Sequence, residues 1–431
     1  MHHYSGKMLI NKVSFIYSSI LIGFSINMSE KVDITIIGAG VIGCAVAYRI
    51  ASEYAGSKDI VVVERNSQIN GENQSSRNSG VIHAGVYYPS DVGPLKAKLC
   101  VEGNRMLYEF CKSHNIPHKM CGKLLIANDT LEEEYLYDVH RIASENNVPD
   151  LEIIDQNDIA ILEPNVYGVK ALYVPTSGVI ESTSLVNKLY ELSEEKEVMF
   201  LVGNKVIKII PHNSGFEVTI ESANDKEVFQ TETLINSAGL YADEIAMMVN
   251  PNCPYRMDPV KGESASFYKS ARDDISMKGL NIYPVPFGYL PDGERLRVGF
   301  REFKKLFDEG KVIKSVGVHL TPTFELSGDE YVIGDTVTIG PAYSTPENRE
   351  DYKATKEPAY YHSMINPFFP NIRLEEINLH QAGIRAKLAG HYDFVIERDP
   401  VHKNLINLIG MDSPGLTSSF AIADYIAKMI H

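Results

Sequence analysis

Hydrophobic residues mark the start of the regular pattern as a β-branched run, Ile34 to Ile37. Apolar positions at helical spacing follow between Ala45 and Ile50, and a second short apolar run spans Ile60 to Val63. A short run of apolar, β-branched residues is typical of a buried strand, whereas apolar residues three and four apart are typical of a helix. The pattern therefore predicts a strand, a helix and a second strand.

Glycines occupy the junction between that first strand and the helix. Residues 38–43 read Gly-Ala-Gly-Val-Ile-Gly. Gly38 permits a tight turn, Gly40 lets a pyrophosphate approach bare backbone, and Gly43 lets the helix pack closely on the strand. The amides at the helix N-terminus can then hold phosphate, so the segment predicts a dinucleotide site.

Glu64 ends the second strand, about 20 residues beyond the last glycine, where such folds place an acidic residue. A carboxylate there accepts both hydroxyls of an adenosine ribose and repels a 2′-phosphate. The stretch predicts an adenine dinucleotide other than NADP, and it does not decide between FAD and NAD. A glycine-rich turn in an ordinary α/β protein is the alternative interpretation.

The pattern continues with further helices and strands. Leu234 to Asn236 is an apolar strand that closes on Ser237, Ala238 and Gly239. We expect this strand end to lie over the nucleotide again, which makes the nucleotide domain discontinuous. The other predicted helices span residues 95–114, 131–146 and 183–192, and the other predicted strands span residues 123–127, 205–210 and 216–221.

The second half of the chain changes character. Residues 254–339 alternate apolar and polar positions with Pro and Gly punctuation, which predicts sheet and not helix. A strand at 405–409, a turn and a helix from Leu416 to Ile430 end the chain. We expect the amides that begin this helix to face a bound ring, because the positive end of a helix stabilises an anion.

Together these elements predict a mixed α/β fold with a Rossmann-like dinucleotide-binding domain and a β-rich substrate-binding cap. Residues 1–31 form an N-terminal extension outside this scheme. We expect residues 32–110, 175–250 and 370–431 in the dinucleotide domain and residues 111–174 and 251–369 in the cap.

Composition narrows the function. A formal net charge of −15 over 431 residues argues against a nucleic-acid partner. An anionic substrate would therefore need a local basic pocket. The five cysteines form no CxxC or CxxxxC pair, which argues against a zinc ribbon and against a redox disulfide. We expect no metal, because no single element carries His, Cys, Asp and Glu at ligand spacing.

The N-terminal segment admits two interpretations. Val13 to Ile26 is uncharged and largely apolar and is preceded by Lys7 and Lys12, as in the hydrophobic region of a signal peptide. The run is too short to span a bilayer as a helix. We expect residues 1–27 to reflect either a start codon assigned too far upstream or a targeting or membrane-associating segment.

A segment of small residues follows the first βαβ unit. Residues 75–80 read Ser-Ser-Arg-Asn-Ser-Gly, and His83, Tyr87 and Tyr88 are polar residues on the apolar track behind them. Small residues let backbone amides crowd a planar ring, so this composition suits one face of a flavin. A solvated loop with a structural histidine is the alternative.

At this point the sequence resembles the FAD-dependent oxidoreductases of the D-amino-acid-oxidase type, over residues 32 to the end. The segments at 38–43, 236–239 and 383–385 carry the general resemblance. Residues 76–88 and 95–103 are similar to the branch that oxidises L-2-hydroxyglutarate, as are Val260 to Glu263, Tyr283 to Pro286, Gly317 to Pro322 and Ser413 to Ser419.

The resemblance implies FAD as cofactor and hydride transfer from the Cα of a small anionic 2-hydroxy acid to flavin N5. His83 is then the base, and a structural role or a covalent flavin tether are its alternatives. Arg385 is expected to grip the 1-carboxylate, unless it pairs with Asp393 or Glu397. The remaining substrate candidates are Tyr87, Lys261, Tyr283, Arg301 and His319. The expected cofactor-binding residues are Gly38, Gly40, Val41, Ile42, Gly43, Glu64, Arg65, Ser76, Asn78, Ser79, Gly80, Val206, Ala238, Gly239, Gly383, Gly415, Leu416 and Thr417.

Two departures from the family pattern concern the substrate. Arg301 to Lys305, with the charged stretch that continues to Lys314, does not align with that pattern. Ala386-Lys387 stands where amino-acid oxidases carry Arg-Pro. The rivals are a glycerol-3-phosphate dehydrogenase, an amino-acid oxidase and a non-catalytic scaffold. The electron acceptor is oxygen, a quinone or a protein carrier. A quinone would favour peripheral membrane contact of a cytoplasmic protein, or of a mitochondrial one if residues 1–27 are a targeting segment.

Overall fold

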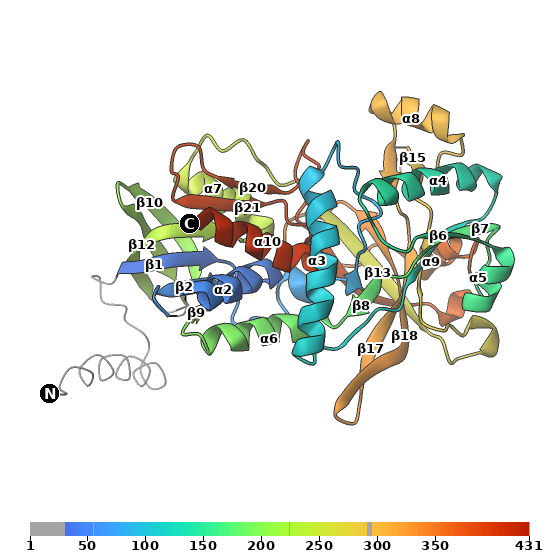
Figure 1. Cartoon of the computed structure of the whole chain (residues 1–431), viewed down its shortest axis with the longest axis horizontal. Helices are drawn as coiled ribbons and strands as arrows, with labels where there is room; N and C mark the ends of the chain where they lie inside the picture. The colour runs from blue at the N-terminus through green and yellow to red at the C-terminus, as the bar shows by residue number, and fades with distance from the viewer. Residues whose placement is uncertain (1–30, 55, 224, 291–294, 431) are drawn as a thin grey trace.

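A computed structural model describes residues 31–54, 56–223, 225–290 and 295–430. The expectations for residues 1–27 lie outside these ranges. Two eight-stranded sheets lie in two lobes, with the long helix α3 (Pro94–Ser113) between them (Figure 1). The mixed α/β fold predicted from the sequence is confirmed.

The first sheet contains the predicted βαβ unit. β1 (Lys31–Ile37) pairs in parallel with β2 (Ile60–Glu64) on one side and with β12 (Lys226–Asn236) on the other. Its outer strands are β9 (Met199–Val202), β10 (Lys205–His212), β11 (Gly215–Glu221), β20 (Val395–Arg398) and β21 (Leu405–Ile409). The carboxyl ends of β1, β2, β12 and β21 therefore meet at one edge, where such sheets bind their ligands.

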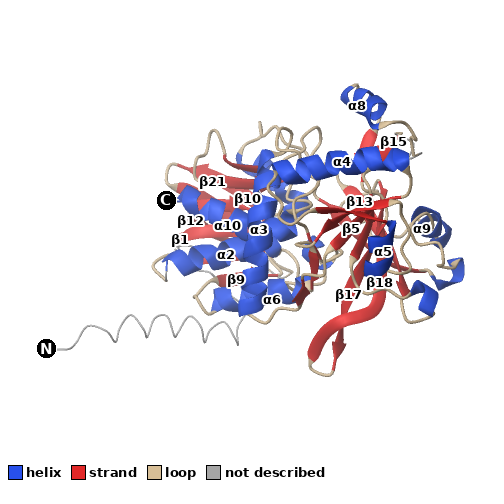
Figure 2. Ribbon diagram, turned by 45° about the vertical axis from the view of Figure 1, so that its right-hand side comes forward, coloured by secondary structure: helices blue, strands red, loops and turns tan. Residues whose placement is uncertain are grey.

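Helices cover both faces of this sheet, because alternate strand residues point to opposite sides. Ile34 and Ile36 pack in one core with four helices, whereas Ile37 and Val63 pack in another with α7 (Ala242–Val249). The four helices are α2 (Val41–Tyr54), α3, α6 (Ser182–Glu194) and α10 (Gly415–Ile430), and α10 contacts both α2 and α3 (Figure 2).

The second sheet is largely antiparallel. Its order is β19 (Asn378–Arg385), β13 (Val260–Tyr268), β18 (Glu330–Ser344), β17 (His319–Ser327), β14 (Asn281–Pro284), β5 (Lys123–Ala127), β7 (Lys170–Val174) and β6 (Glu152–Asp155). The helices of this lobe include α4 (Thr130–Glu145), α5 (Gln156–Leu162) and α9 (Pro358–Ile365). A third, small sheet has the order β3 (Val81–Ile82), β8 (Gly178–Ile180) and β4 (His118–Lys119).

Two expectations differ from these elements. Residues 254–339 were predicted as sheet and not helix, but α8 (Phe300–Asp308) lies there, between β15 (Phe287–Tyr289) and β16 (Ile313–Ser315). Phe300, Phe303 and Phe307 are spaced as in a helix, and Phe303 is buried, a local period that the alternation around it obscures. β19 also lies in the second sheet, although 370–431 was assigned to the nucleotide domain. The division into two domains remains a proposal, and its last segment would begin after Arg385.

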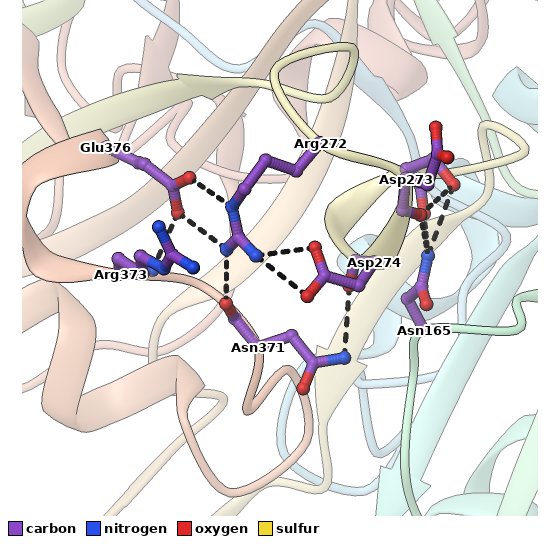
Figure 3. A network of polar contacts seen from close by, with 8 residues as sticks. Asn165, Arg272, Asp273, Asp274, Asn371, Arg373 and Glu376 are labelled. Carbon is purple, nitrogen blue, oxygen red and sulfur yellow. Dashed lines mark hydrogen bonds and ion pairs between the residues drawn. The ribbon is translucent and has the colours of Figure 1, made fainter.

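A polar network braces the far end of the second lobe (Figure 3). The Arg272 guanidinium donates to both carboxylate oxygens of Asp274, to both of Glu376 and to the Asn371 carbonyl, at 2.6 to 3.1 Å. Asn165 donates to the Asp273 carbonyl at 2.9 Å. None of these residues lines the large cavity of the molecule, so we assign the network a structural role.

Three further observations concern the described ranges. No helix there is both long and apolar enough to cross a bilayer. All five cysteines are free thiols. No group of three or more His, Cys, Asp or Glu side chains is arranged to hold a metal ion there.

Candidate active site

A cavity of about 1210 Å³ runs from the nucleotide edge of the first sheet to the face of the second sheet. It is larger than the roughly 300–1,000 Å³ of a pocket for a drug-sized ligand. Residues from both lobes line it, including the glycine segment, the 73–91 loop, β19 and the turn before α10. The cavity therefore suits an extended ligand with a second, smaller molecule beside it.

The glycine segment has the backbone that the sequence predicts. Gly38 has φ +100°, and a Cβ on Gly43 would lie 1.8 Å from the Gly38 carbonyl oxygen. Only glycine fits there, because α2 packs directly on the end of β1. The Val41 amide at the start of α2 donates to Ser75 Oγ at 2.8 Å. An oxygen atom therefore already accepts a hydrogen bond at the N-terminus of this helix, where a phosphate oxygen would also be favoured.

Glu64 connects the end of β2 to the glycine turn. Its carboxylate accepts from the Ala39 amide at 2.8 Å and from the Asn66 amide at 2.9 Å. Each carboxylate oxygen can accept a second hydrogen bond, and Glu64 lines the cavity. The side chain is therefore fixed in place and still able to receive ribose hydroxyls.

His83 follows β3 and faces the cavity. Its Nε2 lies 3.3 Å from Ser413 Oγ, whereas Nδ1 is shielded from solvent and has no partner among the described residues. Burial lowers the pKa of His83 well below its usual 6.5, and the nearby Lys123, His319 and Arg385 lower it further. The imidazole is therefore neutral at pH 7 and able to accept a proton.

Arg385 ends β19 and points into the same cavity. It donates through Nη2 to Asp412 at 2.8 Å and through Nη1 to the Tyr343 hydroxyl at 3.1 Å. Asp412 also accepts from the buried Lys96 at 2.6 Å. The expected pairing of Arg385 with Asp393 or Glu397 is thus not the one found. Its side chain is 37% exposed and retains hydrogens on both terminal nitrogens for a ligand.

Aromatic side chains form the opposite wall. Tyr283 stacks on His319 with ring centroids 3.7 Å apart and an interplanar angle of 10°, and Tyr87 stacks on Tyr283 at 6.3 Å. Lys123 lies behind them, with Nζ 3.9 Å from the centroid of the Tyr283 ring. This wall offers rings and imidazole nitrogens to a ligand.

Most predicted residues meet at this one cavity. His83, Arg385, Tyr87, Tyr283 and His319 line it. The predicted cofactor-binding residues that also line it are Gly38, Gly40, Val41, Ile42, Glu64, Arg65, Asn78, Ser79, Val206, Ala238, Gly239, Gly383, Gly415 and Leu416.

Two predicted substrate residues do not line the cavity. Lys261 is buried and donates to Asp351 and to the Lys353 carbonyl, both at 2.8 Å, so its charge is already neutralised. Arg301 is exposed on α8. The expectation that either grips a substrate carboxylate has no support from this geometry.

Four predicted cofactor residues lie behind the lining. Ser76 bonds within its own loop, and Gly43 and Gly80 are packed against backbone. Thr417 is buried and accepts from the His83 amide at 3.0 Å, which ties the start of α10 to the histidine. Their contribution is to shape the cavity wall.

The sequence did not identify the residues that contact His83 and Arg385. Asp412 and Ser413 are consecutive in the turn before α10 and contact Arg385 and His83 respectively. Ser75, one residue before the predicted Ser76, caps α2. The polar Asp-Ser pair inside a predicted turn was the available signal, but turns commonly carry such residues for local reasons.

The residues present fit a flavin dinucleotide. Three polar atoms of the cavity region, the Arg77 Nε, the Arg385 Nε and the Tyr87 hydroxyl, are buried without a partner among the described residues. Such atoms are rare in proteins unless a ligand or water satisfies them. Gly383 approaches the Arg77 carbonyl so closely that a Cβ would lie 2.1 Å from its oxygen, which keeps this part of the wall flat.

Comparison with known proteins agrees with the interpretation of this cavity as a flavin-binding site. Residues 33–429 match the family described as "DAO: FAD dependent oxidoreductase". The mitochondrial L-2-hydroxyglutarate dehydrogenase of Caenorhabditis elegans is 30% identical over 417 residues, covering 92% of this chain and 93% of the relative. The human mitochondrial L-2-hydroxyglutarate dehydrogenase is 29% identical over 440 residues, covering 93% and 89%. A glycerol 3-phosphate dehydrogenase of Caloramator mitchellensis is 29% identical over 403 residues, covering 92% and 73%.

Solved structures show the same fold. The reduced L-α-glycerophosphate oxidase of Mycoplasma pneumoniae with FAD bound superposes with a TM-score of 0.75 at 21% identity, covering 93% of this chain and 95% of that one. Glycine oxidase from Geobacillus kaustophilus superposes with a TM-score of 0.70 at 14% identity, covering 93% and 95%. The chain belongs to the DAO family of FAD-dependent oxidoreductases, and FAD is its cofactor.

Proposed function

We propose that this enzyme oxidises L-2-hydroxyglutarate to 2-oxoglutarate. The observation that carries the proposal is the meeting of a neutral imidazole, His83, and a partly exposed guanidinium, Arg385, in one cavity beside the dinucleotide edge. Such a pair suits a substrate with a hydroxyl proton to lose and a carboxylate to bind. Relatives of similar length named L-2-hydroxyglutarate dehydrogenases support this substrate.

Arg385 binds the 1-carboxylate in this proposal. Asp412 and Tyr343 each use one hydrogen of its terminal nitrogens, so one hydrogen on each remains to form two parallel bonds with a carboxylate. Asp412 fixes the plane of the guanidinium. Asp412 would repel an anionic substrate if its charge were unpaired. The Lys96 ammonium pairs with Asp412 and reduces this repulsion.

His83 accepts the hydroxyl proton in this proposal. Nδ1 is out of solvent contact, so a proton from the cavity would arrive at Nε2, the nitrogen beside Ser413. The lowered pKa keeps this nitrogen unprotonated at neutral pH. Thr417 and Asn104 hold the backbone amide and carbonyl of His83, which fixes the direction of the ring.

FAD, when bound, supplies the acceptor for the hydride that leaves the substrate Cα. Its adenosine would be held at Glu64 and its pyrophosphate at the start of α2. The isoalloxazine would lie among Ser79, Gly383 and the N-terminus of α10.

For the distal carboxylate we propose the aromatic wall. His319 and Tyr283 line the cavity, whereas Lys261 and Arg301 do not. The His319 Nδ1 contacts Thr321 Oγ1 at 3.1 Å, and Nε2 has no hydrogen-bond partner within the described part of the chain. His319 thereby becomes the leading candidate for the second carboxylate.

Electron acceptor and location extend the proposal. We propose oxygen, a quinone or a protein carrier as acceptor, in a cytoplasmic enzyme or one at a membrane surface. A mitochondrial location, as in the names of the nematode and human relatives, would require residues 1–27 to act as a targeting segment. Fluorescent fusions of the full chain and of residues 28–431 test this directly.

The second candidate substrate is glycerol 3-phosphate, favoured by the relative from Caloramator mitchellensis. One experiment separates the two. Anaerobic bleaching of the flavin absorbance is followed with L-2-hydroxyglutarate, D-2-hydroxyglutarate, glycerol 3-phosphate and several amino acids. Bleaching by glycerol 3-phosphate alone would transfer the chain to that class.

A further inference from the structure

Lys123 is a buried amine that the proposed chemistry leaves unused. It begins β5, is 1% exposed, and its Nζ has no hydrogen-bond partner among the described residues. Burying a lysine amine without a paired carboxylate is costly, so such residues are rare. Lys278 on the same lobe is ordinary by contrast, because it donates to the Ile161 carbonyl at 2.8 Å.

The strand order explains where this amine lies. β14 lies between β5 and β17, and Tyr283 on β14 is therefore approached from opposite sides by Lys123 and His319. Nζ lies 3.9 Å from the centroid of the Tyr283 ring, and the His319 ring stacks at 3.7 Å. The same Nζ lies 5.3 Å from the centroid of the Tyr87 ring. An ammonium over a tyrosine face is stabilised by the ring quadrupole.

We propose that Lys123 is a positioning residue of this active site, whose positive charge behind Tyr283 and Tyr87 acts on His83 and His319 and attracts a dicarboxylate into the cavity. Lys123 touches neither substrate nor cofactor, because it does not line the cavity. The inference deepens the proposed function and rests on it for the identity of the dicarboxylate.

The surroundings of the amine favour a titrating charge. Burial lowers the pKa of Lys123 from 10.5 to about 7. Burial lowers the pKa of His83 and of His319, and the Lys123 charge lowers both further. The groups that face these three residues are Cys100 from α3, Cys121, Tyr87, Tyr283 and Arg385.

The sign of the pH dependence follows. Below about pH 7 the amine carries a proton and attracts an anion, and above that pH the attraction is lost. A bound dianion favours the protonated amine, so binding at pH 7 to 7.5 takes up a proton from water onto Nζ. Binding of a dicarboxylate should therefore weaken as the pH rises through this range.

The test uses 2-oxoglutarate, which cannot reduce the flavin, and measures its Kd from the change in flavin absorbance between pH 6 and pH 8.5. Wild-type Kd should rise about five-fold across this range, on the scale of one charge at intermediate distance. Lys123→Met should bind 2-oxoglutarate about five-fold more weakly than the wild type at pH 6, and its Kd should not rise with pH. Lys123→Arg, which stays charged, should keep tight binding at pH 8.5. Lys208→Met, an exposed lysine on β10, is the control.

A second readout does not depend on the substrate. The C2 proton resonances of the buried histidines, followed by NMR against pH in the FAD-loaded protein, should show a higher pKa for His83 or His319 in Lys123→Met. A Met variant with wild-type histidine titrations and the wild-type Kd profile overturns the inference. If Lys123→Met does not fold, Lys123→Gln takes its place. If no dicarboxylate binds wild type, the proposed function fails, and the histidine titrations alone decide the role of Lys123.

Discussion

Arg385 and Asp412 lie 2.8 Å apart, from Nη2 to Oδ2, and the residue after Asp412 is the serine that contacts His83. Two consecutive residues of one turn therefore contact both Arg385 and His83. Because β19 and the turn before α10 belong to different lobes, the packing of the two lobes brings Arg385 and His83, the proposed carboxylate-binding residue and the proposed base, into one cavity.

The first prediction concerns His83. His83→Asn should keep bound FAD and lower the rate of flavin reduction by about 10²- to 10⁴-fold, because general base catalysis is lost. The measurement is anaerobic stopped-flow absorbance with saturating substrate. His212→Asn, on the exposed end of β10, is the control and should react at the wild-type rate. A wild-type rate in His83→Asn would remove this residue from the chemistry.

Arg385→Lys tests the carboxylate grip. A lysine ammonium cannot form the two parallel bonds, so KM should rise by about 10- to 100-fold, with a smaller fall in kcat. Steady-state kinetics with L-2-hydroxyglutarate measure both. Arg105→Lys keeps the charge of an exposed ion pair on α3 and should change neither constant. Unchanged kinetics in Arg385→Lys would move the carboxylate site elsewhere.

The buried histidines predict how stability depends on pH. His83 and His319 have pKa values held below 6.5 in the folded protein, so the unfolded chain binds more protons once the pH falls through 6.5. The free energy of unfolding should therefore fall as the pH drops from 7.5 to 5.5, by up to about 1.4 kcal/mol per pH unit for each histidine. Urea denaturation of the FAD-loaded protein measures it, and His319→Gln should show a shallower dependence. Equal stabilities at the two pH values would be inconsistent with neutral buried imidazoles.

Gly43→Ala tests the packing of α2 on β1. The added Cβ would lie 1.8 Å from the Gly38 carbonyl oxygen, so either backbone must move. We expect a loss of more than about 3 kcal/mol of stability and loss of bound FAD. Thermal unfolding and the flavin-to-protein absorbance ratio report both. Gly299→Ala, whose Cβ would meet no atom closer than 3.4 Å, is the matched control. A Gly43→Ala protein as stable as the control would contradict the close packing.

The sequence predicted the elements that local patterns determine. The boundaries of β5 agree residue for residue, because a short apolar run between polar residues admits one assignment. α8 escaped because its three phenylalanines at helical spacing lie inside a long stretch of strands. The sequence identified the Gly-Ile-Arg motif at the end of β19 but did not predict that this strand pairs with β13, because strand pairing depends on residues far apart in the chain.

The site was predicted unevenly for a similar reason. His83 and Arg385 stand in recognisable motifs, whereas Asp412, Ser413 and Lys123 meet residues of the cavity through contacts between distant segments. Lys261 shows the converse. Its charge suggested a residue that binds a substrate carboxylate, but Asp351, 90 residues away in the chain, already neutralises that charge. Residue type and spacing identify candidate groups, and the tertiary contacts decide which of them remain free to bind.

The most direct measurement is anaerobic titration of the purified, FAD-loaded protein with the two enantiomers of 2-hydroxyglutarate. The L-enantiomer should bleach the flavin absorbance near 450 nm and release 2-oxoglutarate in equal amount to the flavin reduced. A protein that purifies without flavin and does not take it up, or one whose flavin stays oxidised with every 2-hydroxy acid, would contradict the account.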